Sequence, residues 1–406
     1  MLPRPSNVCA VLGAVSLAMS CAALADDSEH SAPAFKLLTT IPVPGVQMKS
    51  FDISWVDADT QLYYLADRSN RAVDVVDAKR HVFVRQILGG FTGFSGSNDT
   101  SGPNGVVVSG HWLFVTDYPS RVFTIDLRND TVASIASTGG VNRADELAYD
   151  PEDSLILAVN NADEPPFATL LDVDRNTGAL TVRQRITFAD ATNGAEQPVW
   201  NPGTGRFYIS IPQVGANPQD GAVKRIHPQT GAVEATYPVK FCQPAGLTLG
   251  PNQELLLGCS VAFDTAGNTW TRDSAGLAPT AKPESVIMDA RNGNIDKRIQ
   301  GVGGNDEVWY NPGDGRYYLA ARNQPGGSST PGKENFSPVL GIIDAKKMTL
   351  DQVVPTVNQP PGSAHSVAVN PHNNHAFVPF AANNVAPECN NGCIAVFGVP
   401  SGQSGD

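Results

Sequence analysis

The sequence predicts an all-β fold made of seven repeated units, each with four short strands. A short apolar strand, a turn and a second apolar strand recur along the chain, most clearly in DEVWYNPGDGRYYLAARN from Asp306 and EQPVWNPGTGRFYISIPQ from Glu196. The 38 glycines and 31 prolines among 406 residues favour many turns between short strands. Units of this kind bury their apolar faces against one another, so we expect one ring of blades.

The spacing of the units supports the same architecture. Repeats of roughly 40–60 residues with four strand-like runs are typical of β-propeller blades. The first unit shows all four runs, as FDISW, LYYLA, AVDVVD and FVRQIL. Aligned without gaps on the start of the first strand, the units begin at Phe51, Asn104, Asp145, Glu196, Ala245, Asp306 and His365.

The third strand of most units is predicted to end on an aspartate that is followed by turn residues such as RNTG or RNGN. Short Asp and Asn side chains cap such turns, and glycine accepts the positive φ that they require. The aspartates at this position are Asp77, Asp126, Asp174, Asp289 and Asp344.

The seventh unit contains only three strands of its own, HSVAV, HAFVPF and CIAVFGV. A fourth strand is available at the other end of the domain, in FKLLTTIPV from Phe35. Pairing these terminal strands would close the ring and remove its exposed edges. We therefore predict a seven-bladed β-propeller over residues 35–400, with short tails at 26–34 and 401–406.

The first 25 residues are predicted to be a cleavable signal peptide. Arg4 supplies the positive charge, VCAVLGAVSLAMSCAALA is the apolar stretch, and Ala23-Leu24-Ala25 fits the small-x-small cleavage rule. No later run approaches the ~18–20 apolar residues of a membrane span. We expect a soluble protein that is secreted or periplasmic.

Charge and cysteine content restrict the partners. A net charge of −12 and the lack of a basic stripe argue against nucleic acid and anionic membranes. Four cysteines remain after processing, an even number that predicts disulfides in an exported protein. Cys389 and Cys393 flank a tight loop, which leaves Cys242 to pair with Cys259. A thiolate metal site is the less favoured alternative, because neither spacing is C-x-x-C.

Polar residues recur where the first strand of each unit begins. First strands line the channel of a propeller, so these residues are expected to form a ring around one channel mouth. The ring consists of Asn104, Asp145, Glu196, Asp306 and His365, interrupted by Phe51 and Ala245. The next position adds Asp52, Glu146, Gln197 and Glu307, and the end of the second strand adds Asp67, Asp117, Asn160, Ser260 and Arg322.

This ring suggests a site for a small molecule, with or without one divalent cation. Asp145, Glu196, Asp306 and His365 are the candidate metal ligands, since carboxylates suit Ca²⁺ or Mg²⁺ and a histidine admits Zn²⁺. Without a metal, crowded acids should raise one carboxyl pKa and create an acid or base. The candidate catalytic residues are Glu146, Glu307, His365 and Arg322; the candidate substrate-binding residues are Asn104, Asn160, Arg322 and the loop residue Trp270.

A purely structural interpretation competes with this one. Acids on an exposed rim cap backbone amides or pair with arginines such as Arg143 and Arg322, and water-filled channels tolerate polar groups. The recurring aromatic residues are expected to pack between blades, and the histidines of the turns to be solvated. The aromatic residues are Trp55, Tyr149, Trp200 and Tyr310, and the turn histidines include His81, His372 and His375. No motif for a nucleotide, a haem or a flavin occurs, and none of these cofactors is expected.

The blocks NPGDGRYYLA and those of the form IDxxTG resemble the exported bacterial propellers that carry YVTN-type or NHL-type repeats, although the YVTN tetrapeptide itself is absent. The resemblance spans the mature chain. Some members of that group are lactonase-like hydrolases or lyases of lactones. The resemblance thus implies a metal-assisted hydrolase or lyase. The alternative is a non-catalytic propeller whose long loops, such as 260–283, bind a protein, a glycan or a metabolite.

Overall fold

The computed structural model describes residues 1, 34–268, 281–324, 338–356 and 364–400. The chain divides into two units, Met1–Ala32 and Pro33–Asp406, and the fold described below belongs to the second unit. The predicted signal peptide, all but the last residue of the tail at 26–34, and the tail at 401–406 lie outside the described residues, apart from Met1.

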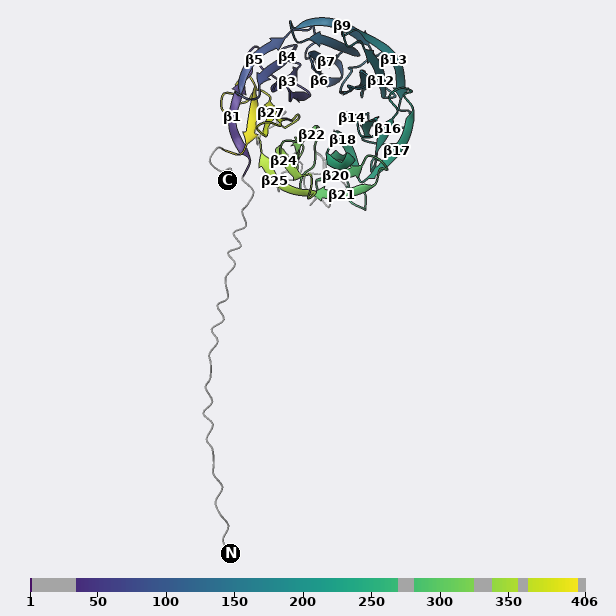
Figure 1. Ribbon diagram of the computed structural model, residues 1–406, viewed down its shortest axis with the longest axis vertical. Helices are drawn as coiled ribbons and strands as arrows, with labels where there is room; N and C mark the ends of the chain where they lie inside the picture. Colours follow the sequence, from purple (N-terminus) through teal and green to yellow (C-terminus); the bar gives the residue numbers. More distant parts are fainter. Residues whose placement is uncertain (2–33, 269–280, 325–337, 357–363, 401–406) are drawn as a thin grey trace. The chain divides into compact units, whose positions relative to one another are not determined.

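Seven four-stranded sheets stand in a ring, as predicted (Figure 1). Every strand pairs antiparallel with its neighbour, and in each sheet the first strand is innermost. Blade 1 contains β2 (Ser54–Asp57), β3 (Leu62–Asp67), β4 (Ala72–Asp77) and β5 (Val82–Ile87). Blade 2 contains β6 (Val106–Ser109), β7 (Trp112–Asp117), β8 (Arg121–Asp126) and β9 (Thr131–Ser137). Blade 3 contains β10 (Leu147–Asp150), β11 (Leu155–Asn160), β12 (Phe167–Val173) and β13 (Leu180–Thr187).

The other four blades follow the same order of strands. Blades 4 to 7 contain β14 (Pro198–Asn201), β15 (Arg206–Ile211), β16 (Asp220–Ile226) and β17 (Val233–Lys240); β18 (Cys242–Leu249), β19 (Glu254–Ala262), β20 (Glu284–Asp289) and β21 (Ile295–Gln300); β22 (Val308–Asn311), β23 (Arg316–Ala321), β24 (Val339–Asp344) and β25 (Thr349–Pro355); and β26 (Ala368–Asn370), β27 (His375–Phe380), β28 (Cys393–Gly398) and β1 (Lys36–Pro42). Two 3₁₀ turns, η1 (Asn98–Thr100) and η2 (Pro251–Gln253), complete the described elements.

The two ends of the domain close the ring, which confirms the sequence prediction. β1 pairs antiparallel with β28, with Ile41 opposite Ile394 and Pro42 opposite Cys393. A buried cluster that includes Tyr63 of blade 1 and Phe377 of blade 7 packs the two blades together beside this seam. β1 thereby covers the edge of β28, which would otherwise be open to pairing with another chain.

The core lies between neighbouring blades rather than at the axis. Side chains alternate along each strand, so both faces of a middle strand contribute to the contact with a neighbouring blade, as in the fully buried β11. Both predicted disulfides are present: Cys242–Cys259 joins β18 to β19, and Cys389–Cys393 closes the loop before β28. Within the described ranges, no helix is long and apolar enough to span a bilayer.

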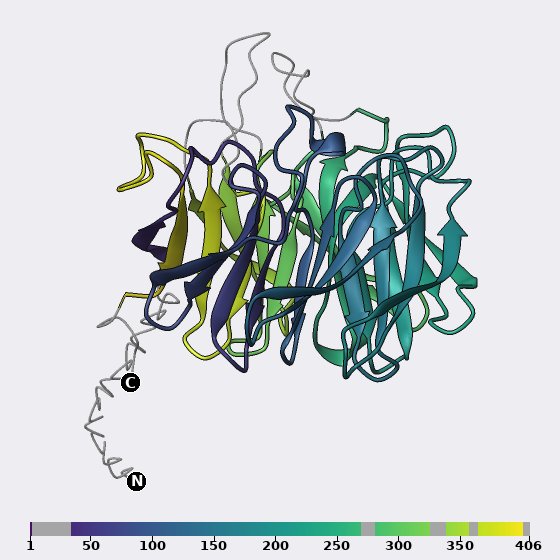
Figure 2. The ribbon, with the colours of Figure 1, turned by 90° about the horizontal axis from the view of Figure 1, so that it is seen from above.

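The predicted turn aspartates end the third strands, with Asp174 one residue beyond β12. Each carboxylate accepts a hydrogen bond from the backbone amide two residues further on, three residues further on, or both. Asp77 accepts from the amides of Lys79 and Arg80, at 3.0 and 2.8 Å. These turns lie on the face of the disc opposite η1, and Figure 2 shows the two faces from the side.

The sequence prediction of the ring residue before the first strand is wrong in blade 1. In five blades, one residue just before the first strand donates its backbone N–H to the second strand: Asn104, Asp145, Glu196, Asp306 and, in blade 1, Asp52, which bonds to Ala66 O at 2.9 Å. The gapless alignment had placed Phe51 at this position. Phe51 instead packs into the core, because the alignment of blade 1 was out of register by one residue.

Candidate functional site

A small cavity of about 110 Å³ lies at the channel mouth, among residues that the sequence spreads over five blades. Apart from Asn98 of η1, each of these residues lies shortly before a first strand or just after a second strand, so the propeller topology itself brings them together. The charged lining consists of Asp52, Arg143, Asp145, Glu146, Glu196, Asp306, Arg322 and His365. Ile53, Asn98 and Asn161 complete the wall.

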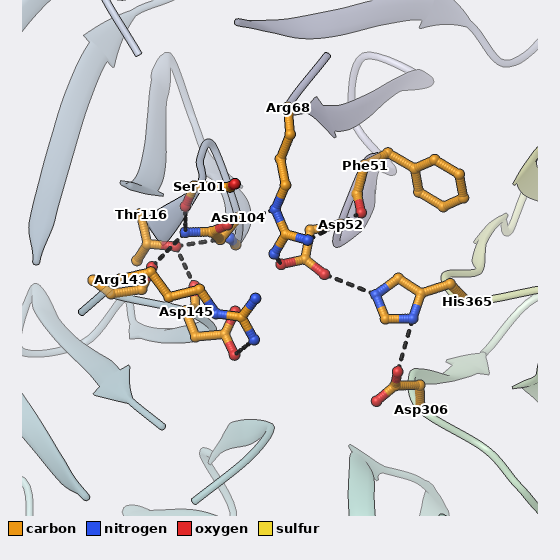
Figure 3. A network of polar contacts seen from close by, with 12 residues as sticks. Phe51, Asp52, Arg68, Ser101, Asn104, Thr116, Arg143, Asp145, Asp306 and His365 are labelled. Carbon is orange, nitrogen blue, oxygen red and sulfur yellow. Dashed lines mark hydrogen bonds and ion pairs between the residues drawn. The ribbon is translucent and has the colours of Figure 1, made fainter. Parts of the chain in front are cut away.

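The His365 ring lies between two carboxylates (Figure 3). Its Nε2 is 2.8 Å from Asp52 Oδ1, and its Nδ1 is 2.7 Å from Asp306 Oδ2. Burial alone would lower the pKa of His365, and Arg322 also opposes its charge, but the two acids outweigh both and raise this pKa to about 9. His365 is therefore an imidazolium at neutral pH, with both nitrogens donating.

A buried arginine supports this arrangement from behind. Arg68 is 1% exposed, forms an ion pair with Asp52, and donates from Nε to Asn104 Oδ1 at 2.8 Å (Figure 3). Burial would raise the pKa of Asp52, but Arg68 and His365 hold it well below its usual range. The sequence analysis missed Arg68. Its position directly after β3 matches that of Arg322 after β23, which could have revealed it.

Two further arginines pair with ring acids. Arg143 contacts Asp145 Oδ2 at 2.7 Å, and Arg322 contacts Asp306 Oδ2 at 2.9 Å. Burial raises the pKa of Asp145 to about 6 against the opposing effect of Arg143. For Asp306, Arg322 and His365 outweigh burial and keep the pKa well below normal. The structural interpretation of the rim, which expected such pairs, is thus correct for these acids.

Glu146 and Glu196 differ from the other acids of the mouth. Neither carboxyl group has a hydrogen bond or ion pair with any residue in the described part of the chain. Burial, with Asp145 and Asp306, raises the pKa of Glu196 to about 8, and Arg143 opposes this only in part. Burial and four neighbouring acids raise the pKa of Glu146 well above its usual value. Glu196 is therefore mostly protonated at pH 7.

Glu307 lines the channel below the mouth rather than the mouth itself. Its Oε2 accepts from the Ser366 hydroxyl and, at 3.1 Å, from the Val367 amide. Burial raises its pKa to about 8 despite these two hydrogen bonds. Glu307 can therefore contact a molecule in the channel, but not one confined to the mouth.

The structure places the two predicted substrate-binding asparagines inside the protein. Asn104 is fully buried and donates to Ser101 O and Ala144 O, at 3.1 and 2.8 Å. Asn160 is also fully buried and accepts from Thr138 at 2.7 Å. Both side-chain amides are hydrogen-bonded inside the protein, and neither residue lines the cavity. Both asparagines therefore support the wall of the cavity and do not contact a ligand there. Trp270 lies outside the described residues.

The four predicted metal ligands line one cavity but do not converge. In the parts of the chain that the structure describes, no group of three or more His, Cys, Asp or Glu side chains is placed to hold a metal ion. His365 in addition has no free lone pair while both its nitrogens donate to carboxylates. A cation bound by Asp145, Glu196 and Asp306 would require these side chains to move.

Gly105 allows the backbone of blade 2 to approach the backbone of Asp145 closely. A Cβ added to Gly105 would lie 2.6 Å from Asp145 O, closer than any side chain tolerates. The Gly105 N–H donates to this same oxygen at 3.0 Å, and the Thr116 hydroxyl also donates to it. The Asp145 backbone is thereby fixed by its neighbouring blade.

One predicted feature of the opposite face is wrong. His375 was expected to be a solvated turn residue, separate from His81. The structure brings the two together across the seam between blades 7 and 1, with His81 Nε2 2.8 Å from His375 Nδ1. Burial, together with His81, lowers the pKa of His375 to about 4.

Comparisons with known proteins support the fold but do not identify a function. No protein-family model and no curated protein sequence matches this chain. Among solved structures, the chain is similar to hydrazine synthase from Kuenenia stuttgartiensis, with a TM-score of 0.62 and 13% sequence identity, over 87% of this chain and 96% of that one. A likeness at so low an identity shows the propeller fold; it does not confirm the YVTN or NHL repeat type.

Proposed function

We propose that the protein is an exported enzyme that transfers protons on a small molecule at the channel mouth, in a hydrolase or lyase reaction of lactone type. The observation that supports this most directly is the pair Asp145 and Glu196. They line the same cavity, yet their pKa values differ, at about 6 and about 8. Neighbouring groups whose environments separate their pKa values in this way are suited to act as base and acid.

The roles follow from the charges. In lactone hydrolysis, Asp145 would accept a proton from the attacking water while Glu196 donates one to the ring oxygen as the C–O bond breaks. In a lyase reaction, Asp145 would instead remove a carbon-bound proton. Arg322, which is partly exposed, would receive the carboxylate that develops. The imidazolium of His365 holds Asp52 and Asp306 in place.

The test uses δ-valerolactone and p-nitrophenyl acetate as probe substrates. Glu196→Gln should lower kcat/KM by about 100-fold or more, the usual contribution of a general acid. Glu152→Gln, an exposed glutamate beside the turn after β10, is the matched control and should not change kcat/KM. Full turnover by Glu196→Gln on a substrate that the wild type converts would contradict the proposal.

In a second version of this proposal, a divalent cation (Ca²⁺, Mg²⁺ or Zn²⁺) assists the reaction. Asp145, Glu196 and Asp306 are the residues that would hold it. Treatment with a chelator separates the two versions. Lost turnover that the added metal restores would favour the metal-assisted reaction, and unchanged turnover would favour the carboxyl groups alone. Export is tested by the mass of the mature protein, which should begin at Asp26.

A non-catalytic binding propeller is the second candidate, and one observation favours it. A polar cavity of about 320 Å³ lies at the base of the long loop of blade 5, lined by Phe241, Phe263, Lys282 and Arg298 among others. A partner protein, glycan or metabolite held there would depend on the loop and not on the ring. Replacing Phe263 by alanine should then abolish binding, while Glu196→Gln leaves it unchanged.

A further inference from the structure

The central channel below the mouth is unusual in being lined mainly by apolar side chains. It has a volume of about 370 Å³, within the range of small-molecule sites. The recurring aromatic residues pack against the blade cores, as expected, but they also line this channel. They are Trp55, Tyr149, Trp200 and Tyr310, and Trp309 lines the channel as well. Apolar walls around water are unfavourable, so an apolar occupant would be stabilised here.

The channel and the mouth adjoin each other at Glu146. Glu146 and Ile53 line both cavities. Glu146, Gln197 and Glu307 each immediately precede a first strand, and all three line the channel. The top of an apolar channel is therefore bordered by two carboxyl groups and one amide.

Glu146 has no internal partner to balance a charge. Glu146 is 7% exposed, and its carboxyl group has no hydrogen bond or ion pair within the described ranges. The four cations of the mouth all pair with other acids: Arg68 and His365 with Asp52, Arg143 with Asp145, and Arg322 with Asp306. A buried carboxylate needs a paired cation, and among the residues that the structure describes none is paired with Glu146.

We propose that the channel binds the apolar part of an organic amine whose ammonium group lies between Glu146 and Glu307. Aromatic faces attract ammonium groups, which adds to the attraction of the two acids. A metal ion fits less well, because no three acidic or histidine side chains of the described chain converge on one point. The proposal rests on the proposed function in one respect: the reacting group of the same molecule would extend into the mouth.

The test measures binding of n-alkylamines from butylamine to octylamine, by calorimetry and by the fluorescence of Trp55, Trp200 and Trp309. Affinity should rise about fourfold per methylene until the channel is full. Each amine should bind about tenfold or more tightly than the alcohol of equal length, because only the amine carries a charge.

Two variants examine the two ends of the site. Glu146→Gln keeps the shape but removes the acid that would ionise beside an ammonium group, and should weaken octylamine binding about tenfold. Thr248→Trp, which fills the channel from β18, should shorten the longest chain that gains affinity. Glu152→Gln and Thr349→Trp place the same changes on exposed positions and should bind as the wild type does.

Three results would overturn the proposal: alcohols that bind as tightly as amines, unchanged binding by Glu146→Gln, or binding of Ca²⁺ or Zn²⁺ but of no amine. Amine binding requires no turnover, so the two proposals fail separately. Amine binding together with full turnover by Glu196→Gln would contradict only the reaction. Lost turnover in Glu196→Gln without amine binding in the wild type would contradict only the ligand.

Discussion

Asp289 on the turn face of the propeller and Glu196 at the mouth carry the same carboxyl group, but their pKa values are shifted in opposite directions. On the turn face, Asp289 accepts from the backbone amide of Arg291 at 2.7 Å and from its guanidinium group, and its pKa is lowered. At the mouth, Glu196 has no such donor among the described residues, and its pKa is raised to about 8. The hydrogen-bond donors around each carboxyl group, first the Arg291 guanidinium group and then its backbone amide for Asp289, therefore decide the direction of the shift.

Strand pairing explains why the turn acids and the mouth acids have different hydrogen-bond donors. In the turns, amides that follow the third strand have no ladder partner, so the aspartate side chain accepts from them. At the mouth, the backbone N–H of Glu196 is already bonded to Ser210 O, at 3.0 Å. The mouth acids are left with one another and with arginines, in a confined space where like charges repel.

The largest effect should come from breaking the buried pair at the mouth. Asp52→Asn leaves Arg68 charged and almost fully buried, and should lower the free energy of unfolding by about 3–5 kcal/mol. Asp172→Asn breaks an exposed pair with Arg183 and should cost only about 0–1 kcal/mol. Urea denaturation measures both. Equal losses would mean that burial does not distinguish these acids.

The second effect is a dependence of stability on pH. His365 has a pKa of about 9 in the folded protein against 6.5 when unperturbed, so the folded state binds the proton more tightly. Its stabilisation is complete below pH 6.5 and disappears as the pH rises through 9, a loss of about 3 kcal/mol. Glu196 acts in the same direction between pH 4.5 and 8, because its folded pKa is also raised.

Comparison with His365→Asn isolates the histidine. The unfolding free energy of the wild type should fall steeply between pH 7 and 9, and that of the variant should fall much less. Urea titrations at pH 6, 7, 8 and 9 give both profiles. Parallel profiles would show that His365 does not hold its proton more tightly in the folded state.

The smallest effect should be at the turns. Asp77→Ala removes the acceptor for two backbone amides and should cost about 1 kcal/mol. Asp77→Asn keeps an acceptor oxygen and should restore most of the loss. Thermal unfolding of the two variants and the wild type is the measurement. An asparagine variant as unstable as the alanine variant would show that charge, not hydrogen bonding, stabilises the turn.

Most of the fold could be predicted because periodicity is a local signal. Strands such as LYYLA and turns such as NPGDG repeat in each unit, and the missing strand of the seventh unit matched the segment from Phe35. The site was predicted less completely. The alignment without gaps was out of register by one residue in blade 1, so it placed Phe51 where Asp52 belongs. The position shared with Arg322 could have revealed Arg68, but the His81–His375 contact joins blades 1 and 7, which a repeat pattern cannot reveal.

The sequence by itself determined the seven blades, the closure of the ring, the disulfides and the gathering of polar residues at one mouth, because strand periodicity and turn chemistry act over a few residues. Only the tertiary structure decided which of those residues are paired, which are buried and which meet the cavity. Asn104 and Glu196 occupy the same place in their repeats, yet Asn104 is buried inside the wall, whereas Glu196 lines the cavity and has no hydrogen-bond partner among the described residues. Burial and charge depend on neighbours from other blades, and those neighbours are set by packing.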